Sequence, residues 1–397
     1  MRNFMAVAPR TAAPHAHWGP APLTAVRIAV LAAVLSVLVS AGARFALAGA
    51  PPPLVWFAHS DVAAMVLTQP TLERHWPYFT YPFFYQPLLG WLTAALSYVA
   101  PSPLLLVLLI DAVVAAGAGI TAALLCGMAG PRRTLAFWSL SPQLLLFGGA
   151  NVDALAVLLL VLATRSAHGR GYLSAVWLAL GTAMKAFPLV ALPPLILTRL
   201  RARPRRALGV GLVALGVLAI VDGPAVLAPH SLLTYGVAAY ADRPWNIDSI
   251  WLPVALVLRG VASDVTVDRA ISAISLGGVA VSYVLLVLRP SLRGADAMRL
   301  GWLGVCVLLL WTRLHSVQYA IWLLPVFALY VPRYRLFALM ILGDVLVYLA
   351  VTPFNGLAMA ASSAEAAPFV AAIAAGVIVR HAAVIRLTFL LARGDRR

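Results

Sequence analysis

The chain has 397 residues, of which 62% are hydrophobic and 11% are charged, and its mean hydropathy is +0.93. A soluble domain carries about 25% charged residues, so the composition excludes an ordinary soluble enzyme. The net charge of +16 comes almost entirely from arginines in the short gaps between long apolar runs, since Lys185 is the only lysine. This pattern is typical of cytoplasmic loops facing anionic lipid, so we expect membrane lipids and no nucleic acid as partners.

Apolar runs of about 17–25 residues, continuous rather than alternating, predict transmembrane helices. We therefore expect one all-α, polytopic membrane domain over 1–397, with a cytoplasmic basic head (1–24) and basic tail (386–397). The expected spans, about 12 in number, are 25–47, 103–128, 134–150, 152–165, 171–187, 188–198, 207–224, 267–288, 300–312, 317–331, 336–352 and 367–385. The arginine-rich composition is typical of a high-GC bacterium, so we expect the bacterial plasma membrane.

The first external loop, 48–101, contains one of only 13 acidic residues of the chain, Asp61, in the stretch His59-Ser60-Asp61. A carboxylate at a membrane–water boundary is a candidate general base. The alternative is that Ser60 or Asp61 caps a short helix. The aromatic stretch 79–89 follows, and Tyr81 either helps to bind a sugar or belongs to an interfacial aromatic belt. We expect 83–100 to be an interfacial helix rather than a span.

Two further junctions between apolar runs carry polar residues. Counting spans from the arginine-rich cytoplasmic gaps places both junctions on the external side, as it does Asp61. Asn151 and Asp153 follow a Gly-Gly pair, where Asn151 is a candidate helix cap and Asp153 is harder to explain as one. Lys185 lies between two expected spans on the external side, against the usual bias of positive charge towards the cytoplasm. It either extends to the interface or binds an anion such as phosphate.

The second external segment, 225–266, includes a short helix expected at 250–260 and a polar cluster before it. This cluster combines an aromatic ring with hydrogen-bonding groups in Arg243, Trp245, Asn246 and Asp248. It is typical of carbohydrate-binding surfaces, and the alternative is an ordinary solvated loop.

A last polar cluster joins the expected spans 300–312 and 317–331. Its candidates are Arg313 and His315 for phosphate, and Gln318 and Tyr319 for sugar hydroxyls. All of these clusters fall at the external surface although they are far apart in sequence. Ionisable groups near membrane depth are costly and mark functional sites, so we expect the clusters to form one site.

The sequence lacks a P-loop, a Gly-rich dinucleotide motif, a HExxH motif and Cys/His zinc spacing. Cys126 and Cys306 both lie inside apolar runs and are expected to be core residues. We therefore expect neither a cofactor nor a catalytic metal.

The order of these segments resembles the integral-membrane glycosyltransferases of the GT-C superfamily. The residues that carry it are Asp61, the Tyr81-Pro82 start of an interfacial helix, the 141–153 segment, Lys-x-Phe-Pro-Leu at 185–189 and His-Ser-x-Gln-Tyr-x-x-Trp-Leu-Leu-Pro at 315–325. Within that superfamily the chain is most similar to actinobacterial polyprenyl-phosphate-mannose-dependent α-mannosyltransferases, which elongate phosphatidylinositol mannosides and lipomannan. The resemblance covers about residues 25–350.

The resemblance implies an inverting, metal-independent transfer of mannose from a polyprenyl-phosphate donor to a glycolipid acceptor, at an active site facing the exterior. Asp61 would be the catalytic base, although it lacks the nearby Tyr that family members often carry. Lys185, Arg313 and His315 would hold the donor phosphate. The remaining candidates would contact the acceptor or the sugar: His59, Tyr81, Asn151, Asp153, Arg243, Trp245, Asn246, Asp248, Gln318 and Tyr319.

Three carboxylates are alternative bases: Asp153, Asp248 and Glu365, the last expected in an external loop. The sequence also leaves other functions open, namely transfer of arabinose from a similar donor, and a lipid-linked-sugar flippase or transporter. A transporter needs ionisable groups near the bilayer midplane, and only Asp111 and Asp344 are acids expected deep inside spans.

Overall fold

A computed structural model describes residues 21–52, 54–69, 75–167, 169–200, 203–241, 243–288, 296–360 and 363–393. The basic head up to residue 20 and the tail from 394 lie outside the described residues. Within these ranges the chain is helical, and its only strand-like pairing is an isolated bridge between Pro77 and Tyr81. The all-α prediction is therefore confirmed.

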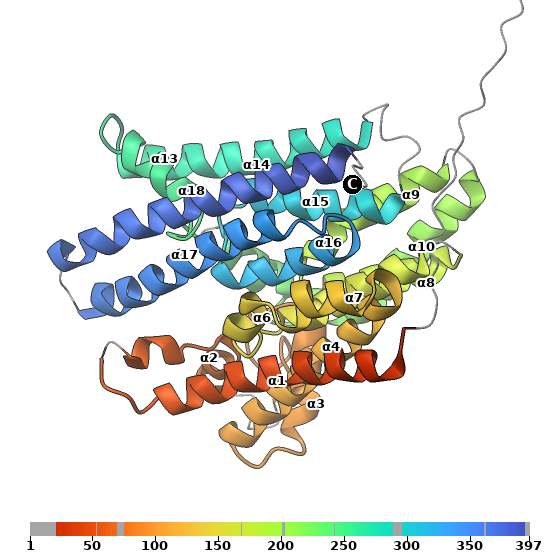
Figure 1. Ribbon diagram of the computed structural model, residues 1–397, viewed down its shortest axis with the longest axis horizontal. Coiled ribbons are helices and arrows are strands. Elements are labelled where there is room, and N and C mark those ends of the chain that lie inside the picture. The colour runs from red at the N-terminus through yellow and green to blue at the C-terminus, as the bar shows by residue number, and fades with distance from the viewer. Residues whose placement is uncertain are drawn as a thin grey trace, which may run out of the picture.

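The α-helices occupy most of the chain (Figure 1). They are α1 (Leu23–Leu47), α2 (Asp61–Thr68), α3 (Pro87–Ser97), α4 (Pro103–Ala129), α5 (Pro131–Thr134), α6 (Pro142–Phe147), α7 (Asp153–Ser166), α8 (Gly171–Met184), α9 (Leu192–Leu200), α10 (Pro204–Val221), α11 (Gly223–Leu227), α12 (Ala238–Ala241), α13 (Trp251–Leu258), α14 (Asp264–Leu288), α15 (Ala297–Trp311), α16 (Leu324–Leu329), α17 (Tyr334–Ala360) and α18 (Ser363–Arg393). Short stretches of 3-10 helix and of π-helix join them. The 3-10 stretches are η1 (Leu54–Ala58), η4 (Phe187–Ala191) and η7 (Val317–Leu323), and the π stretches are η3 (Leu135–Ser139) and η5 (Leu232–Val237).

Six helices of the described chain are long and apolar enough to cross a bilayer: α1, α4, α10, α14, α17 and α18. Each coincides with one of the expected spans, so the protein is a membrane protein. The other expected spans correspond to helices of 15 residues or fewer, such as α7, α8 and α15, or to short helices joined by a 3-10 or π turn. These interruptions occur where the sequence places its polar residues.

Close helix packing at small residues supports the core. On α4, a side chain at Gly119 would approach Val34 of α1, and one at Gly117 would approach Leu155 of α7. The Gly148-Gly149 pair after α6 lies directly against α1, since a Cβ at Gly149 would lie 2.5 Å from the backbone nitrogen of Ala41. Only glycine permits this approach, which holds the 148–152 bend in place.

The structure also corrects several element boundaries. The interfacial helix expected over 83–100 is shorter, because Pro87 starts it and it ends at Ser97. Glu365 was expected in an external loop, but α18 begins at Ser363, so Glu365 is helical; its side chain lies outside the described part. The tail expected from 386 is helical to Arg393, because the apolar pattern continues through that turn.

Different segments of the chain lie at the two ends of the helix bundle (Figure 1). The junction of α17 with α18, helix α13 and the end of α1 that leads into α2 lie at the left of the view. The C-terminal end of α18 and helix α9 lie at the right. The rings of Phe57 and Tyr348 lie 5.5 Å apart, so η1 packs on the C-terminal half of α17.

Candidate functional site

A buried arginine positions the segment before Asp61. Arg44, in the last turn of α1, is only 8% exposed and donates to the backbone oxygens of Phe57 (3.3 Å), His59 and Leu146 (2.6 Å). The first two oxygens lie in the loop that precedes α2, and the third lies on α6. Arg44 therefore fixes residues 57–59 against both helices.

Asp61 is the first residue of α2, and two hydrogen bonds fix the start of this helix. The Ser60 hydroxyl accepts a bond from the Ala63 amide at 3.3 Å, as the N-cap alternative predicted. The Asp61 amide donates to the Ala150 carbonyl oxygen at 2.9 Å, so the start of α2 is held against the 148–152 bend. The serine is therefore the cap, and the Asp61 carboxylate is free for other partners.

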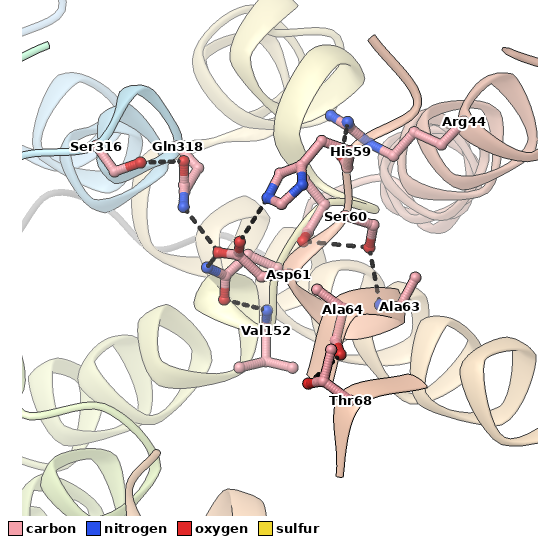
Figure 2. A network of polar contacts seen from close by, with 12 residues as sticks. Arg44, His59, Ser60, Asp61, Ala63, Ala64, Thr68, Val152, Ser316 and Gln318 are labelled. Carbon is pink, nitrogen blue, oxygen red and sulfur yellow. Dashed lines mark hydrogen bonds and ion pairs between the residues drawn. The ribbon is translucent and has the colours of Figure 1, made fainter. Parts of the chain in front are cut away.

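Three side chains from separate parts of the chain hold the Asp61 carboxylate (Figure 2). Its Oδ1 lies 3.0 Å from His59 Nε2, while Oδ2 accepts from Asn151 Nδ2 at 2.7 Å and from Gln318 Nε2 at 3.0 Å. Gln318 is 257 positions away in sequence. A carboxylate has about four lone-pair sites, so one remains available for a further donor.

The Asp61 side chain is 31% exposed, so a substrate hydroxyl can reach it. Burial raises its pKa, but the hydrogen bond from His59, the positive charge of Lys185 and the bond from Asn151 outweigh burial. On balance the pKa lies below its ordinary value of 3.8. Asp61 is therefore an ionised acceptor throughout the physiological pH range.

Beside this carboxylate, Lys185 forms an ion pair with Asp153, the first residue of α7. The Asp153 side chain is fully buried, whereas that of Lys185 is 16% exposed. Lys185 lies in the break between α8 and η4, where the chain leaves helical geometry after Met184. The only lysine is thus held at the site by a buried carboxylate.

A stack of aromatic rings lies beside Lys185. Trp322 stacks on Phe187 at 4.0 Å and on Tyr319 at 4.1 Å, with interplanar angles of 11° and 19°. The Lys185 ammonium lies 4.9 Å from the Tyr319 ring centroid and 5.7 Å from that of Trp322. Phe187 and Trp322 are buried, so the stack holds Lys185 in place, while Lys185 and Tyr319 are partly exposed and can contact an anion or a sugar.

The 246–248 turn meets the 313–317 segment that leads into Gln318. The Asn246 side chain donates to the His315 carbonyl oxygen at 2.8 Å, and its backbone amide donates to that of Arg313, also at 2.8 Å. The Asp248 carboxylate accepts from the Val317 amide at 3.0 Å. The 246–248 turn therefore positions the segment that carries Gln318, and burial raises the pKa of Asp248 to about 6.

His315 lies below the site surface rather than in it. It is 3% exposed, and its ring lies 5.7 Å from that of Tyr319 and 5.8 Å from that of His381. Burial and the nearby positive charge of Arg380 lower its pKa well below the usual 6.5, so the imidazole is neutral.

The remaining candidates lie around the site or away from it. Arg313 donates to the Ser272 hydroxyl (2.8 Å) and to the Tyr240 carbonyl oxygen (3.2 Å), which joins it to α14 and α12. Trp245 donates to Asp268 at 2.8 Å, and Arg243 is exposed. Tyr81 is 6% exposed and packs on Phe83. None of these four has a direct bond to Asp61, Lys185 or Asp153 among the described residues.

Three residues that help to form the site, Arg44, Phe187 and Trp322, were not predicted from the sequence. Arg44 falls inside an expected span, where a charge is costly, and that cost was the available signal. Phe187 and Trp322 belong to the two motifs quoted for the resemblance, but nothing in their spacing predicted that they would stack.

Neither the protein-family models nor the curated proteins compared with the chain gave a match. Among the described residues there is no group of three or more His, Cys, Asp or Glu side chains that could hold a metal ion.

Proposed function

We propose that this protein is an inverting glycosyltransferase of about twelve spans and GT-C type. In this proposal it transfers mannose from a polyprenyl-phosphate donor to a glycolipid acceptor on the external face of the bacterial plasma membrane. The observation that carries it is Asp61, an ionised and partly exposed carboxylate held by His59, Asn151 and Gln318. Three donors fix the position of this carboxylate and keep it ionised, and the open lone pair can accept a hydrogen bond from a substrate hydroxyl.

The proposed step is a single displacement. An acceptor hydroxyl donates its hydrogen bond to the open lone pair of Asp61, and its oxygen attacks the anomeric carbon of the donor sugar. As that bond forms, the bond from the anomeric carbon to the phosphate oxygen breaks, and the phosphate leaves with the electron pair. The hydroxyl proton passes to Asp61. No metal ion takes part in the step as proposed.

Lys185 is the group best suited to the departing phosphate. Its ammonium is partly exposed, and it lies over Tyr319 and Trp322 near the Asp61 carboxylate. A phosphate would share the ammonium with Asp153 and gain a charge-assisted hydrogen bond as its own negative charge increases. Arg313 and His315 are less suited, because the arginine is bonded to Ser272 and Tyr240 and the histidine is buried and neutral. We assign both to holding the segment that carries Gln318.

Two alternatives remain for the experiment to separate. Transfer of arabinose would use the same Asp61 and Lys185 chemistry. A lipid-linked-sugar flippase is favoured by one observation, the fully buried Asp344 on α17, whose Oδ1 lies 3.9 Å from Arg380 of α18. Buried charges inside a helix bundle are typical of transport pathways.

The test is a transfer assay on the purified full chain. Radiolabelled polyprenyl-phosphate-mannose and a phosphatidylinositol-mannoside acceptor are given to the wild type, Asp61→Asn and Asp264→Asn. The control, Asp264, is 73% exposed and pairs with Arg259 on the surface. We expect Asp61→Asn to lower the rate by about 10²–10⁴-fold and Asp264→Asn to leave it unchanged.

Each outcome assigns the function differently. A wild type that transfers neither mannose nor arabinose refutes the glycosyltransferase proposal, and a lipid-flipping assay then tests the transporter. If Asp61→Asn keeps its rate, the base lies at Asp153, Asp248 or Glu365.

The pH profile supplies a second check. Because the pKa of Asp61 is lowered below 3.8, the base stays ionised as the pH falls from 7 to 5, so its protonation should not reduce the rate over that interval.

A further inference from the structure

A groove of about 420 Å³ lies between α17 and α18, away from Asp61. Its lining consists of three arginines and three leucines: Arg333, Arg335, Leu336, Leu339, Arg386 and Leu390. We propose that this groove binds the phosphate of an anionic phospholipid, with the arginines on the headgroup and the leucines along the acyl chains. This inference does not depend on the proposed transfer reaction.

The groove lies at the end of the bundle opposite to the candidate site. The far part of α17 packs on the segment before Asp61, since Gly356 approaches Trp56 and Tyr348 contacts Phe57. Tyr334, at the start of α17, is 22 residues earlier, which places it about 33 Å away at 1.5 Å per residue. That distance is about the thickness of the hydrocarbon core, so the groove opens at the other membrane surface.

The charge in the groove is not compensated by the described protein. Among the described residues, no carboxylate forms an ion pair with Arg333, Arg335 or Arg386. The first turn of α17 contains no acidic residue. Three guanidinium groups gathered without a counter-ion repel one another, and an anion from outside the chain relieves that repulsion.

Aromatic contacts hold the two helices that carry the groove. At the start of α17, the Phe137 ring lies 4.8 Å from that of Tyr334 and 5.0 Å from that of Phe337. On α18, Phe389 lies between two arginines, with Arg386 at 5.7 Å and Arg393 at 4.1 Å from its ring centroid. The Arg386 guanidinium therefore lies beside an aromatic ring of its own helix.

The lining favours a phospholipid over free phosphate. Guanidinium groups bind phosphate oxygens in pairs, and basic pockets between transmembrane helices bind lipid headgroups. Leu339 is 39% exposed and lines the same groove as the arginines, so apolar surface lies directly beside the guanidinium groups. An acyl chain covers such a surface.

The test measures lipid binding to the full chain in a nonionic detergent by native mass spectrometry. The ligands are phosphatidylglycerol, phosphatidylcholine of the same chain length, and inorganic phosphate. The variants are Arg333→Gln/Arg335→Gln/Arg386→Gln and a control with the same loss of charge, Arg132→Gln/Arg133→Gln/Arg205→Gln. The control arginines are exposed and lie outside the groove.

We expect the wild type and the control triple variant to retain phosphatidylglycerol over phosphatidylcholine, and the groove variant to bind it roughly tenfold or more weakly. Equal losses in both triple variants would overturn the proposal, because diffuse surface charge would then explain the binding. Inorganic phosphate competing as well as the lipid would assign the groove to a soluble phosphate instead. If the groove triple variant does not fold, Arg386→Gln alone and the wild-type preference between the two lipids decide the matter.

Discussion

The ion pair of Lys185 with Asp153 gives a sharp prediction for stability. Lys185→Met leaves a carboxylate that is 0% exposed without its cation, whereas Asp153→Asn leaves an ammonium that is 16% exposed and lies over two aromatic rings. Removing one partner of a buried pair costs about 3–5 kcal/mol. We expect Lys185→Met to reach that range and Asp153→Asn to cost less, about 1–3 kcal/mol, because its cation keeps partial access to water and a cation–π contact.

These energies convert to measurable melting temperatures. At about 2 cal/mol/K of unfolding entropy per residue, the 397-residue chain has roughly 0.8 kcal/mol/K, so 4 kcal/mol lowers the melting temperature by about 5 °C. Tryptophan fluorescence of the detergent-solubilised protein follows the transition. The double variant, Lys185→Met with Asp153→Asn, should be more stable than Lys185→Met alone, because no unpaired charge remains buried.

A surface pair serves as the control for this cycle. Arg259 and Asp264 lie 2.9 Å apart but are 44% and 73% exposed, so their coupling should stay under about 1 kcal/mol in the cycle Arg259→Met, Asp264→Asn and the double variant. Effects at Lys185 and Asp153 that simply add would refute the reasoning, because additivity means that neither charge depends on the other.

Three further predictions concern other parts of the molecule. Burial raises the pKa of the Asp248 carboxyl from 3.8 to about 6, so the folded state is most stable below pH 4, where the group is protonated, and loses that stability as the pH rises through 6. Between pH 4 and 8 the stability of Asp248→Asn should therefore rise by up to about 3 kcal/mol relative to that of the wild type. Parallel stability curves of the two proteins would contradict this. Gly149→Ala should destabilise by about 1–3 kcal/mol, because its Cβ would press on the backbone of α1, whereas Gly127→Ala, with open space around it, should stabilise slightly in the same melting assay. In intact cells a membrane-impermeant thiol reagent should label Asp61→Cys and not Arg205→Cys, and the opposite pattern would reverse the proposed sidedness of the site.

The sequence alone determined the class of the protein and the positions of its polar junctions. Long apolar runs have few alternatives to membrane helices, because a backbone in lipid must satisfy its own hydrogen bonds. Interruptions at Gly148-Gly149, at Lys185 and at 312–316 were visible for the same reason, since polar residues, glycine and proline break an apolar pattern. The prediction of a helix cap at Ser60 was also local, because capping depends on neighbouring residues.

The partners of those polar residues were decided only by the tertiary structure. Asp61 lies close to Gln318 across 257 positions, and no spacing in the sequence encodes that contact. The sequence assigned Lys185 to a phosphate and Asp153 to an acceptor, but folding places them together, because a carboxylate buried at the start of α7 needs a cation. His315 lies inward because the 246–248 turn forms hydrogen bonds to the backbone of residues 315 and 317 and so fixes the orientation of that segment. Local patterns thus determine where charges occur in the chain, while the long-range packing of helices determines which charges meet.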